Sequence, residues 1–99
     1  MNTSNINSIK NSIYPICKKY NIEHMYLFGS HARGEATVES DYDFFLDKAG
    51  DIKSLLTLSG FRLALIECLG KDVDIITALD DNSIFGNYVK KDMVTIYEN

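Results

Sequence analysis

The chain has 99 residues, 45% of them hydrophobic, and carries a formal net charge of -4 at pH 7. This length suits one compact domain over residues 1–99 and leaves no room for a second hydrophobic core. The negative net charge repels phosphate polymers, which disfavours nucleic acid as the direct substrate.

The cysteines indicate a reducing compartment. Cys17 and Cys68 lie far apart among apolar residues and do not form a CxxC pair. This pattern predicts buried, reduced thiols rather than a disulfide framework or a zinc site, and hence a cytoplasmic protein. Residues 1–8 are rich in Asn and Ser and lack the basic and apolar regions of a signal peptide. No run approaches the ~18 apolar residues of a membrane span, so we expect no membrane association.

The first elements expected along the chain are a helix, a strand and a single helical turn. Apolar residues recur at helical spacing over residues 6–20, although Pro15 inside this stretch predicts a kink or a break near Tyr14. Residues 24–28 form a short aromatic and apolar run that indicates a strand. Residues 30–35 then have the length of one helical turn.

A strand and a long helix follow. Residues 41–46 predict the second strand, and residues 52–69 predict a helix that is apolar on more than one side. Ser59-Gly60 would divide this helix in two, with Ser59 as the cap of the second piece. The apolar excess of the helix suits either the domain core or a partner-binding face.

The last elements expected are a strand over residues 73–77, a short helix over residues 83–90 and a final strand over residues 93–97. Strands and helices thus alternate along one small unit. This alternation predicts an α/β or α+β fold in which helices pack on a small mixed β-sheet.

The first chemical signal is a pair of acids in the second predicted strand. Residues two apart in a strand point to the same side, so Asp41 and Asp43 present two carboxylates on one face. Such a pair is costly without a cation, whereas a hard divalent ion such as Mg²⁺ favours both ionised groups. Asp74 is flanked by apolar residues in the third predicted strand, which favours it over Asp72 as the buried, inward acid. If these strands are adjacent, Asp41, Asp43 and Asp74 converge on a site for two metal ions bridged by phosphates.

The second chemical signal is Gly29-Ser30, at the exit of the first predicted strand. Glycine permits close backbone approach, and the free N–H groups of the turn can hold phosphate oxygens together with the Ser30 hydroxyl. Ser30 is equally suited to be a helix N-cap, a role that uses the same N–H groups. Arg33 suits either a phosphate contact or a surface ion pair with Glu35 or Glu39.

The spacing of these motifs resembles that of a known family. Gly29-Ser30, ten intervening residues and then Asp41-Tyr42-Asp43 are similar to the signature of the DNA polymerase β-type nucleotidyltransferase superfamily. The longer strings LFGSHARGEATVESDYDFFL and GKDVDII resemble its MNT branch, the minimal nucleotidyltransferases usually paired with a HEPN-domain toxin. The resemblance spans nearly the whole chain and implies the polymerase-β-like fold.

This resemblance also implies a mechanism. Asp41 and Asp43 would bind the metal ions, and Asp74 would help to position or deprotonate the acceptor hydroxyl. Gly29 and Ser30 would contact the β- and γ-phosphates of ATP while pyrophosphate leaves. For the MNT branch, the resemblance implies an antitoxin that transfers AMP from ATP to a tyrosine hydroxyl of its HEPN ribonuclease partner and so silences it.

Two other functions are compatible with the same residues. One is a binding module that masks its partner and has a vestigial site, and close, mutually repelling carboxylates argue against it. The other is a nucleotidyltransferase that acts on a small hydroxylated molecule or an RNA end, which would need more surface than a catalytic core. Lys91-Asp92-Met93 departs from the family pattern, because a glycine is expected before the last strand. His24 and His31 are expected to be ordinary histidines, since chemistry on carboxylates and Mg²⁺ needs neither.

Overall fold

Residues 2–99, which the computed structural model describes, alternate between helices and strands. The elements in chain order are α1 (Asn2–Lys19), β1 (His24–Phe28), α2 (Ser30–Arg33), β2 (Tyr42–Lys48), α3 (Leu55–Leu69), β3 (Val73–Ile76), α4 (Ile84–Asp92) and β4 (Val94–Glu98). Every helix and strand expected from the sequence is present, with bounds that differ by a few residues. Within residues 2–99, no helix has the length and apolar character to cross a membrane.

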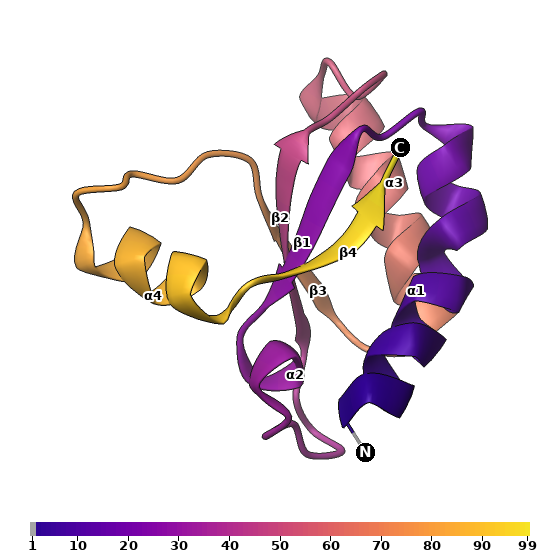
Figure 1. Ribbon diagram of the computed structural model, residues 1–99. Coiled ribbons are helices and arrows are strands. Elements are labelled where there is room, and N and C mark those ends of the chain that lie inside the picture. The colour runs from indigo at the N-terminus through magenta and orange to yellow at the C-terminus, as the bar shows by residue number, and fades with distance from the viewer. Residues whose placement is uncertain (1) are drawn as a thin grey trace.

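One mixed sheet joins the four strands in the order β3-β2-β1-β4. β1 pairs antiparallel with both β2 and β4, whereas β2 and β3 run parallel. Parallel neighbours need a crossover connection, and α3 provides it. Figure 1 shows β1 and β2 at the centre of the sheet, with α2 at one end of it. The mixed sheet with packed helices that the sequence predicts is therefore confirmed.

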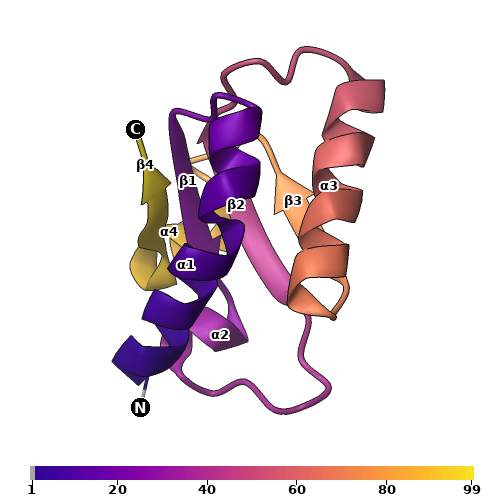
Figure 2. The same cartoon turned by 90° about the vertical axis from the view of Figure 1, so that its right-hand side faces the viewer.

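α1 and α3 cover one face of the sheet, as Figure 2 shows. The core beneath them draws fully buried side chains from both helices and from three strands. These side chains are Ile13, Cys17, Leu27, Phe44, Phe61, Leu65 and Val73, each with an exposed fraction of 0%. Burial of a large apolar side chain stabilises a fold by about 1.5–3 kcal/mol, so this layer holds the sheet and both helices together.

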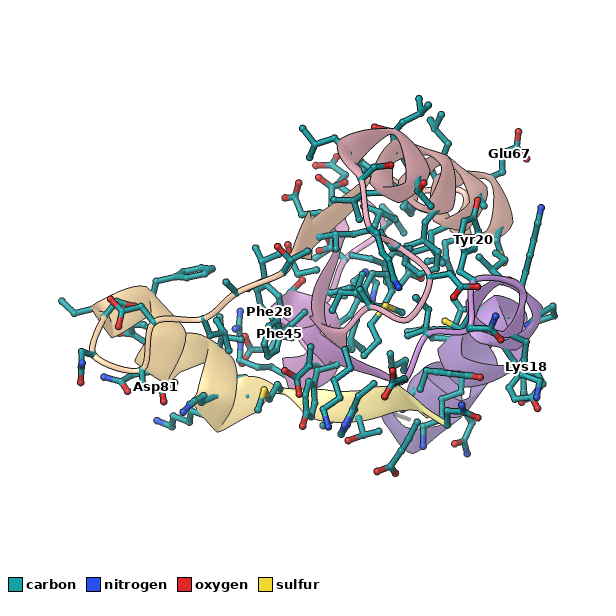
Figure 3. The ribbon with its side chains drawn as sticks, turned by 90° about the horizontal axis from the view of Figure 1, so that it is seen from above. Lys18, Tyr20, Phe28, Phe45, Glu67 and Asp81 are labelled. Carbon is teal, nitrogen blue, oxygen red and sulfur yellow. The ribbon has the colours of Figure 1, made fainter. Side chains whose placement is uncertain are left out.

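The opposite face carries a smaller apolar cluster beside α4. Phe28, Phe45 and Val89 are buried in this cluster. In Figure 1, α4 stands on the side of the sheet away from α1, and Figure 3 shows Phe28 and Phe45 on the side that faces α4. Successive residues of a strand point to opposite faces, so Phe44 enters the larger core and its neighbour Phe45 enters the smaller cluster.

α1 continues as one helix through Pro15, and the break expected near Tyr14 is wrong. Proline lacks the N–H group that would bond the carbonyl one turn earlier. Pro15 is exposed, so water can reach that carbonyl, while Ile13 and Cys17 on the other side of the helix are fully buried. Packing of this apolar stripe keeps the helix in one piece.

α3 is a single helix that begins at Leu55, so the expected division at Ser59-Gly60 is wrong. Phe61 and Leu65 are fully buried directly after this dipeptide. Their packing outweighs the weak helix propensity of glycine, which costs about 1 kcal/mol in a helix interior.

The apolar excess of α3 is partly on the surface. Leu55, Leu56 and Leu63 have exposed fractions of 82%, 84% and 59%. One side of the helix thus belongs to the core, and these three side chains do not.

α4 ends without the glycine that the family pattern leads one to expect. Met93, which caps the helix, has φ -70° and ψ 142°, an ordinary extended conformation. The Met93 N–H donates to the Val89 carbonyl at 2.9 Å. The departure at Lys91-Asp92-Met93 therefore produces a turn that needs no glycine.

Cys17 is buried, but Cys68 is exposed, so the expectation of two buried thiols is wrong for Cys68. The Cys68 Sγ donates to the Ser12 carbonyl of α1 at 3.1 Å. The thiol thus lies at the rim between α1 and α3, outside the core that the two helices cover.

Candidate active site

The pairing of β2 with β3 sets two acids side by side. Asp43 and Asp74 occupy partner positions in the register of these parallel strands. Both side chains lie on the face opposite α1 and α3, since Phe45 and Ile76, two residues further on, pack in the cluster beside α4. The adjacency of these strands, on which the expected convergence of acids depends, is confirmed.

Asp74, rather than Asp72, is the acid beside Asp43. Asp72 is occupied by other groups, because its Oδ1 accepts from Arg62 Nη2 at 2.8 Å and from the Val73 N–H at 3.0 Å. Asp74 is nevertheless exposed, so the expectation that it is buried is wrong. The reason is that β3 lies at the edge of the sheet, where the face that carries Asp74 stays open to solvent.

The acids make ionisation of Asp43 more costly. Burial raises the pKa of Asp43, and the nearby charges of Asp74 and then Asp41 raise it further. His31 and Arg33 lower the pKa by smaller effects. The protein groups around Asp43 therefore supply less positive charge than its carboxylate needs.

A hard divalent cation would supply the missing charge. Asp41 is exposed and precedes β2 by one residue, so it flanks the strand instead of lying inside it as expected. Across residues 2–99, no three His, Cys, Asp or Glu side chains stand close enough to enclose a metal ion by themselves. Asp41, Asp43 and Asp74 therefore do not form a closed set of metal ligands, and an ion held beside Asp43 would need further ligands from water or phosphate oxygens.

Gly29 lies directly against Asp43. Its φ of 79° and ψ of -157° fall in a region that is open almost only to glycine. A β-carbon on Gly29 would overlap Asp43 Oδ2 and stand 3.2 Å from Asp43 Cγ. Because Gly29 has no side chain, the backbone of the turn after β1 can approach a group bound by the Asp43 carboxylate closely.

Ser30 is the first residue of α2, and Gly29 occupies the N-cap position. The alternative in which Ser30 caps this helix is therefore wrong. The first N–H groups of a helix have no partner inside it, so the turn at Ser30 offers hydrogen-bond donors beside Asp43.

Arg33 forms two ion pairs. Its Nε donates to Glu35 Oε1 at 3.1 Å, and its Nη1 donates to Asp92 Oδ2 at 3.2 Å. The sequence offered an ion pair of Arg33 with Glu35 or Glu39 as one alternative. The structure shows the pair with Glu35, and its second pair is with Asp92. The Arg33 side chain is still 42% exposed and lines the same cavity as Asp43. Pairing therefore does not remove Arg33 from the site.

A cavity of about 400 Å³ lies between these residues and α4. Gly29, Arg33, Asp43 and Asp74 line it from the sheet and from α2. Its other lining residues come from the strands and from α4, and they are Phe28, Ile75, Ile76, Phe85, Tyr88, Val89 and Asp92. The acids thus open into a space that is mostly apolar on its remaining sides.

Phe85, Tyr88 and Asp92 are site residues that the motif spacing does not reveal. They recur at intervals of three and four residues along α4, so they lie on one face of this helix. Two aromatic residues followed by an acid on one face of a short helix are a signal that could have indicated this wall.

Both histidines have contacts of their own. His31 stacks on Tyr42 with ring centroids 3.9 Å apart, and its Nε2 lies 3.4 Å from the Ser40 carbonyl oxygen. His24 stacks on Tyr26 with ring centroids 4.3 Å apart. Each histidine thus has an aromatic partner within the chain, and that neither is needed for the chemistry stays a prediction.

Comparison with known sequences identifies relatives of this chain. The family model described as Polymerase beta, Nucleotidyltransferase matches residues 11–99. A protein of Methanocaldococcus jannaschii with the provisional name protein adenylyltransferase is 44% identical over 73 residues, which cover 74% of this chain and 77% of that protein. Another protein of the same organism, with the same provisional name, is 43% identical over 77 residues, which cover 74% of this chain and 71% of that protein.

Solved structures share the fold. A provisionally assigned minimal nucleotidyltransferase matches with a TM-score of 0.70 and 26% identity over 95% of each chain. A toxin-antitoxin structure with AMP-PNP matches with a TM-score of 0.72 and 20% identity, over 91% of this chain and 73% of the other. A chain from the complex of the tri-AMPylated Shewanella oneidensis HEPN toxin with MNT antitoxin matches with a TM-score of 0.61 and 20% identity, over 100% of this chain and 74% of the other. At this level of identity, the last two matches show the fold alone.

Proposed function

This chain belongs to the polymerase β nucleotidyltransferase family, and we propose that it is a Mg²⁺-dependent antitoxin that transfers AMP from ATP. The acceptor in this proposal is a tyrosine hydroxyl of a HEPN ribonuclease toxin, which the modification silences. The observation that carries the proposal is the position of Asp43, beside Asp74 in the sheet and against the bare backbone of Gly29.

Asp41, Asp43 and Asp74 would hold two Mg²⁺ ions. When bound, Mg²⁺ supplies the positive charge that the carboxylates and the triphosphate share, and it makes the α-phosphate easier to attack. The raised pKa of Asp43 supports this assignment, since neighbouring acids disfavour its ionised form until a cation stands beside it.

The turn at Gly29-Ser30 would hold the β- and γ-phosphates. Backbone N–H groups at the start of α2 and the Ser30 hydroxyl would donate hydrogen bonds to phosphate oxygens. Arg33 adds a positive charge at the same cavity, where a phosphate oxygen would replace one of its present partners, Glu35 or Asp92. These contacts would fix the leaving group while the α-phosphate faces the acids.

Asp74 would position the acceptor hydroxyl and take its proton. The tyrosine oxygen then forms a bond to the α-phosphorus of ATP. The bond between this phosphorus and the oxygen that bridges to the β-phosphate breaks, and pyrophosphate leaves. Asp74 is exposed and lines the cavity, which lets a hydroxyl from another molecule reach it.

The relatives of this chain support a protein as the acceptor. The M. jannaschii relatives have the provisional name protein adenylyltransferase, and one structural neighbour comes from a complex with a tri-AMPylated HEPN toxin. We place the complex in the cytoplasm, because the exposed free thiol of Cys68 suits a reducing compartment.

Co-expression with a HEPN protein encoded beside this chain tests the proposal against its non-catalytic alternative. The wild type is expected to add AMP to a tyrosine of the partner, which mass spectrometry of the intact partner and its peptides would detect. Asp43→Asn is expected to abolish this addition while the partner still co-purifies. Asp47→Asn is the matched control, because Asp47 lies on the same strand, is exposed and does not line the cavity. A toxin that Asp43→Asn silences as well as the wild type does would contradict the proposal.

A further inference from the structure

The wall of the cavity that α4 provides is aromatic and open to solvent. Phe85 and Tyr88 line the cavity together with Asp43 and Asp74, and their exposed fractions are 56% and 64%. They lie three residues apart on α4, so both rings project from one face of the helix. The cavity thus has acids on its sheet side and two aromatic rings on its helix side.

Other residues hold α4 in place. Val89 is only 2% exposed and anchors the helix in the smaller apolar cluster. The ion pair between Arg33 Nη1 and Asp92 Oδ2, at 3.2 Å, links the last turn of α4 to α2. Phe85 meets Phe28 edge to face with ring centroids 6.2 Å apart, yet more than half of its surface stays exposed. Packing within the chain therefore does not account for these exposed aromatic rings, whereas a ligand bound in the cavity would cover them.

The charges around the cavity limit which part of a ligand can meet these rings. The charged residues that line it are Arg33, Asp43, Asp74 and Asp92, and Arg33 is paired with Asp92. Phe85 and Tyr88 offer no charge to a phosphate, but an aromatic ring does stack on a flat heterocycle. A nucleoside triphosphate has an anionic end for the metal-binding acids and a flat end for the rings.

We propose that Phe85 and Tyr88 form the binding site for the base of the donor nucleotide, which stacks on their rings while its triphosphate lies near Asp43 and Gly29. This inference rests on the proposed function, because it places the base of the same donor. A volume of about 400 Å³ lies within the range of small-molecule sites, which combine an apolar lining with a few polar groups. Stacking also gives a reason for two aromatic rings to be exposed beside the acids.

Replacement of each ring by leucine tests the proposal, because leucine keeps an apolar side chain and removes the stacking surface. The full chain with Mg²⁺ is titrated calorimetrically with a non-hydrolysable ATP analogue and, separately, with tripolyphosphate, which has no base. Phe85→Leu and Tyr88→Leu are each expected to weaken binding of the analogue about tenfold, as the loss of one base–aromatic stack does. Neither variant is expected to change the affinity for tripolyphosphate.

Three further variants are controls. Phe85→Tyr and Tyr88→Phe keep the rings and are expected to bind the analogue as the wild type does. Leu56→Ala removes an apolar side chain that is 84% exposed on α3, which covers the other face of the sheet, and is expected to have no effect. Nuclear Overhauser contacts between the base protons and the rings of Phe85 and Tyr88 in the wild type give the same answer without any variant.

The outcomes separate this inference from the proposed function. Folded leucine variants that bind the analogue as tightly as the wild type would overturn the inference, and a raised KM for the acceptor in these variants would assign the rings to the acceptor. A parallel loss of tripolyphosphate binding would also overturn it, because stacking cannot act on a ligand without a base. A wild type that binds no nucleotide would overturn the proposed function as well, whereas normal binding by every variant leaves that function standing.

Discussion

Gly29 is packed so closely against Asp43 that a β-carbon on Gly29 would overlap the Asp43 Oδ2 atom. Gly29 follows β1, and Asp43 lies on the neighbouring strand β2, opposite Phe28 in the register of the two strands. The glycine-serine turn and the acidic strand that the sequence singles out therefore lie directly against each other.

Gly29→Ala is expected to lower transfer activity by at least about 100-fold, because the new methyl group would displace the Asp43 carboxylate. The backbone conformation of Gly29 adds a destabilisation of about 1–3 kcal/mol for any residue with a β-carbon. Activity would be measured by release of pyrophosphate and stability by urea unfolding.

Gly70→Ala separates the two effects. Gly70 also has a positive φ, of 72°, but a β-carbon there would meet no atom within 4 Å. This variant is expected to lose about 1 kcal/mol of stability and to keep its activity. Equal losses of activity in both variants would show that general destabilisation, and not the position of Asp43, is responsible.

Asp43→Asn is expected to stabilise the metal-free protein at neutral pH. Burial and the charges of Asp74 and Asp41 raise the pKa of Asp43 above its ordinary value. When the pKa of an acid is higher in the folded protein than in the unfolded protein, the acid contributes stability at pH values below its pKa in the unfolded protein. This contribution is lost as the pH rises through its pKa in the folded protein. The difference in unfolding free energy between the variant and the wild type should therefore grow from acid pH towards neutrality, as urea titrations at several pH values would show.

Mg²⁺ should reverse this order. A cation bound only to the folded wild type raises its melting temperature, and this rise grows with the ratio of the Mg²⁺ concentration to the Kd. The neutral amide that Asp43→Asn introduces cannot replace the lost carboxylate as a ligand. Thermal melts with Mg²⁺ and with EDTA would measure the difference. A wild type that melts at the same temperature in both, at Mg²⁺ concentrations that support activity, would argue against the metal-binding role of Asp43.

Arg33→Ala is expected to raise the KM for ATP about tenfold with little change in kcat, because it removes a charge that would bind the triphosphate. The Arg33 side chain is 42% exposed in both of its ion pairs, so solvent weakens these pairs and the melting temperature should fall only slightly. Glu35→Gln is the matched variant, since it breaks the 3.1 Å pair and keeps the guanidinium. Steady-state kinetics that show a normal KM for both variants would reduce Arg33 to a surface ion pair.

The two thiols should differ in reactivity. Cys68 is exposed and is expected to react with Ellman's reagent in the native protein. Burial raises the pKa of Cys17 to about 12, so this thiol stays protonated and reacts only after unfolding. Cys68→Ser should therefore abolish the native reaction, and rapid labelling of Cys17 in that variant would show that the core beneath α1 opens.

The local part of the site could be predicted from the sequence. Asp43 and its neighbour Phe44 face opposite sides because side chains alternate along a strand, and this alternation depends on no distant contact. Gly29-Ser30 marks a turn for an equally local reason, since a backbone with positive φ favours glycine. Such features follow from spacing alone.

The other wall of the site depends on tertiary packing. Phe85 and Tyr88 reach the cavity because Val89 is buried against the second face of the sheet, and no local pattern says which face α4 covers. Pro15 and Cys68 depart from expectation for the same reason, because their surroundings are set by how α1 and α3 pack. The spacing of residues in the sequence therefore locates the acids of the site. The aromatic residues on the opposite wall can be identified only once the tertiary structure is known.

The most direct test of the central claim uses ATP that carries its radiolabel on either the α- or the γ-phosphate, with Mg²⁺ and a co-purified HEPN partner. The wild type is expected to transfer the α-label to a partner tyrosine and to release the γ-label as pyrophosphate, whereas Asp41→Asn/Asp43→Asn transfers neither. A folded, partner-bound wild type that leaves the partner unlabelled, or that transfers the γ-label instead, would contradict the claim that these acids catalyse nucleotidyl transfer.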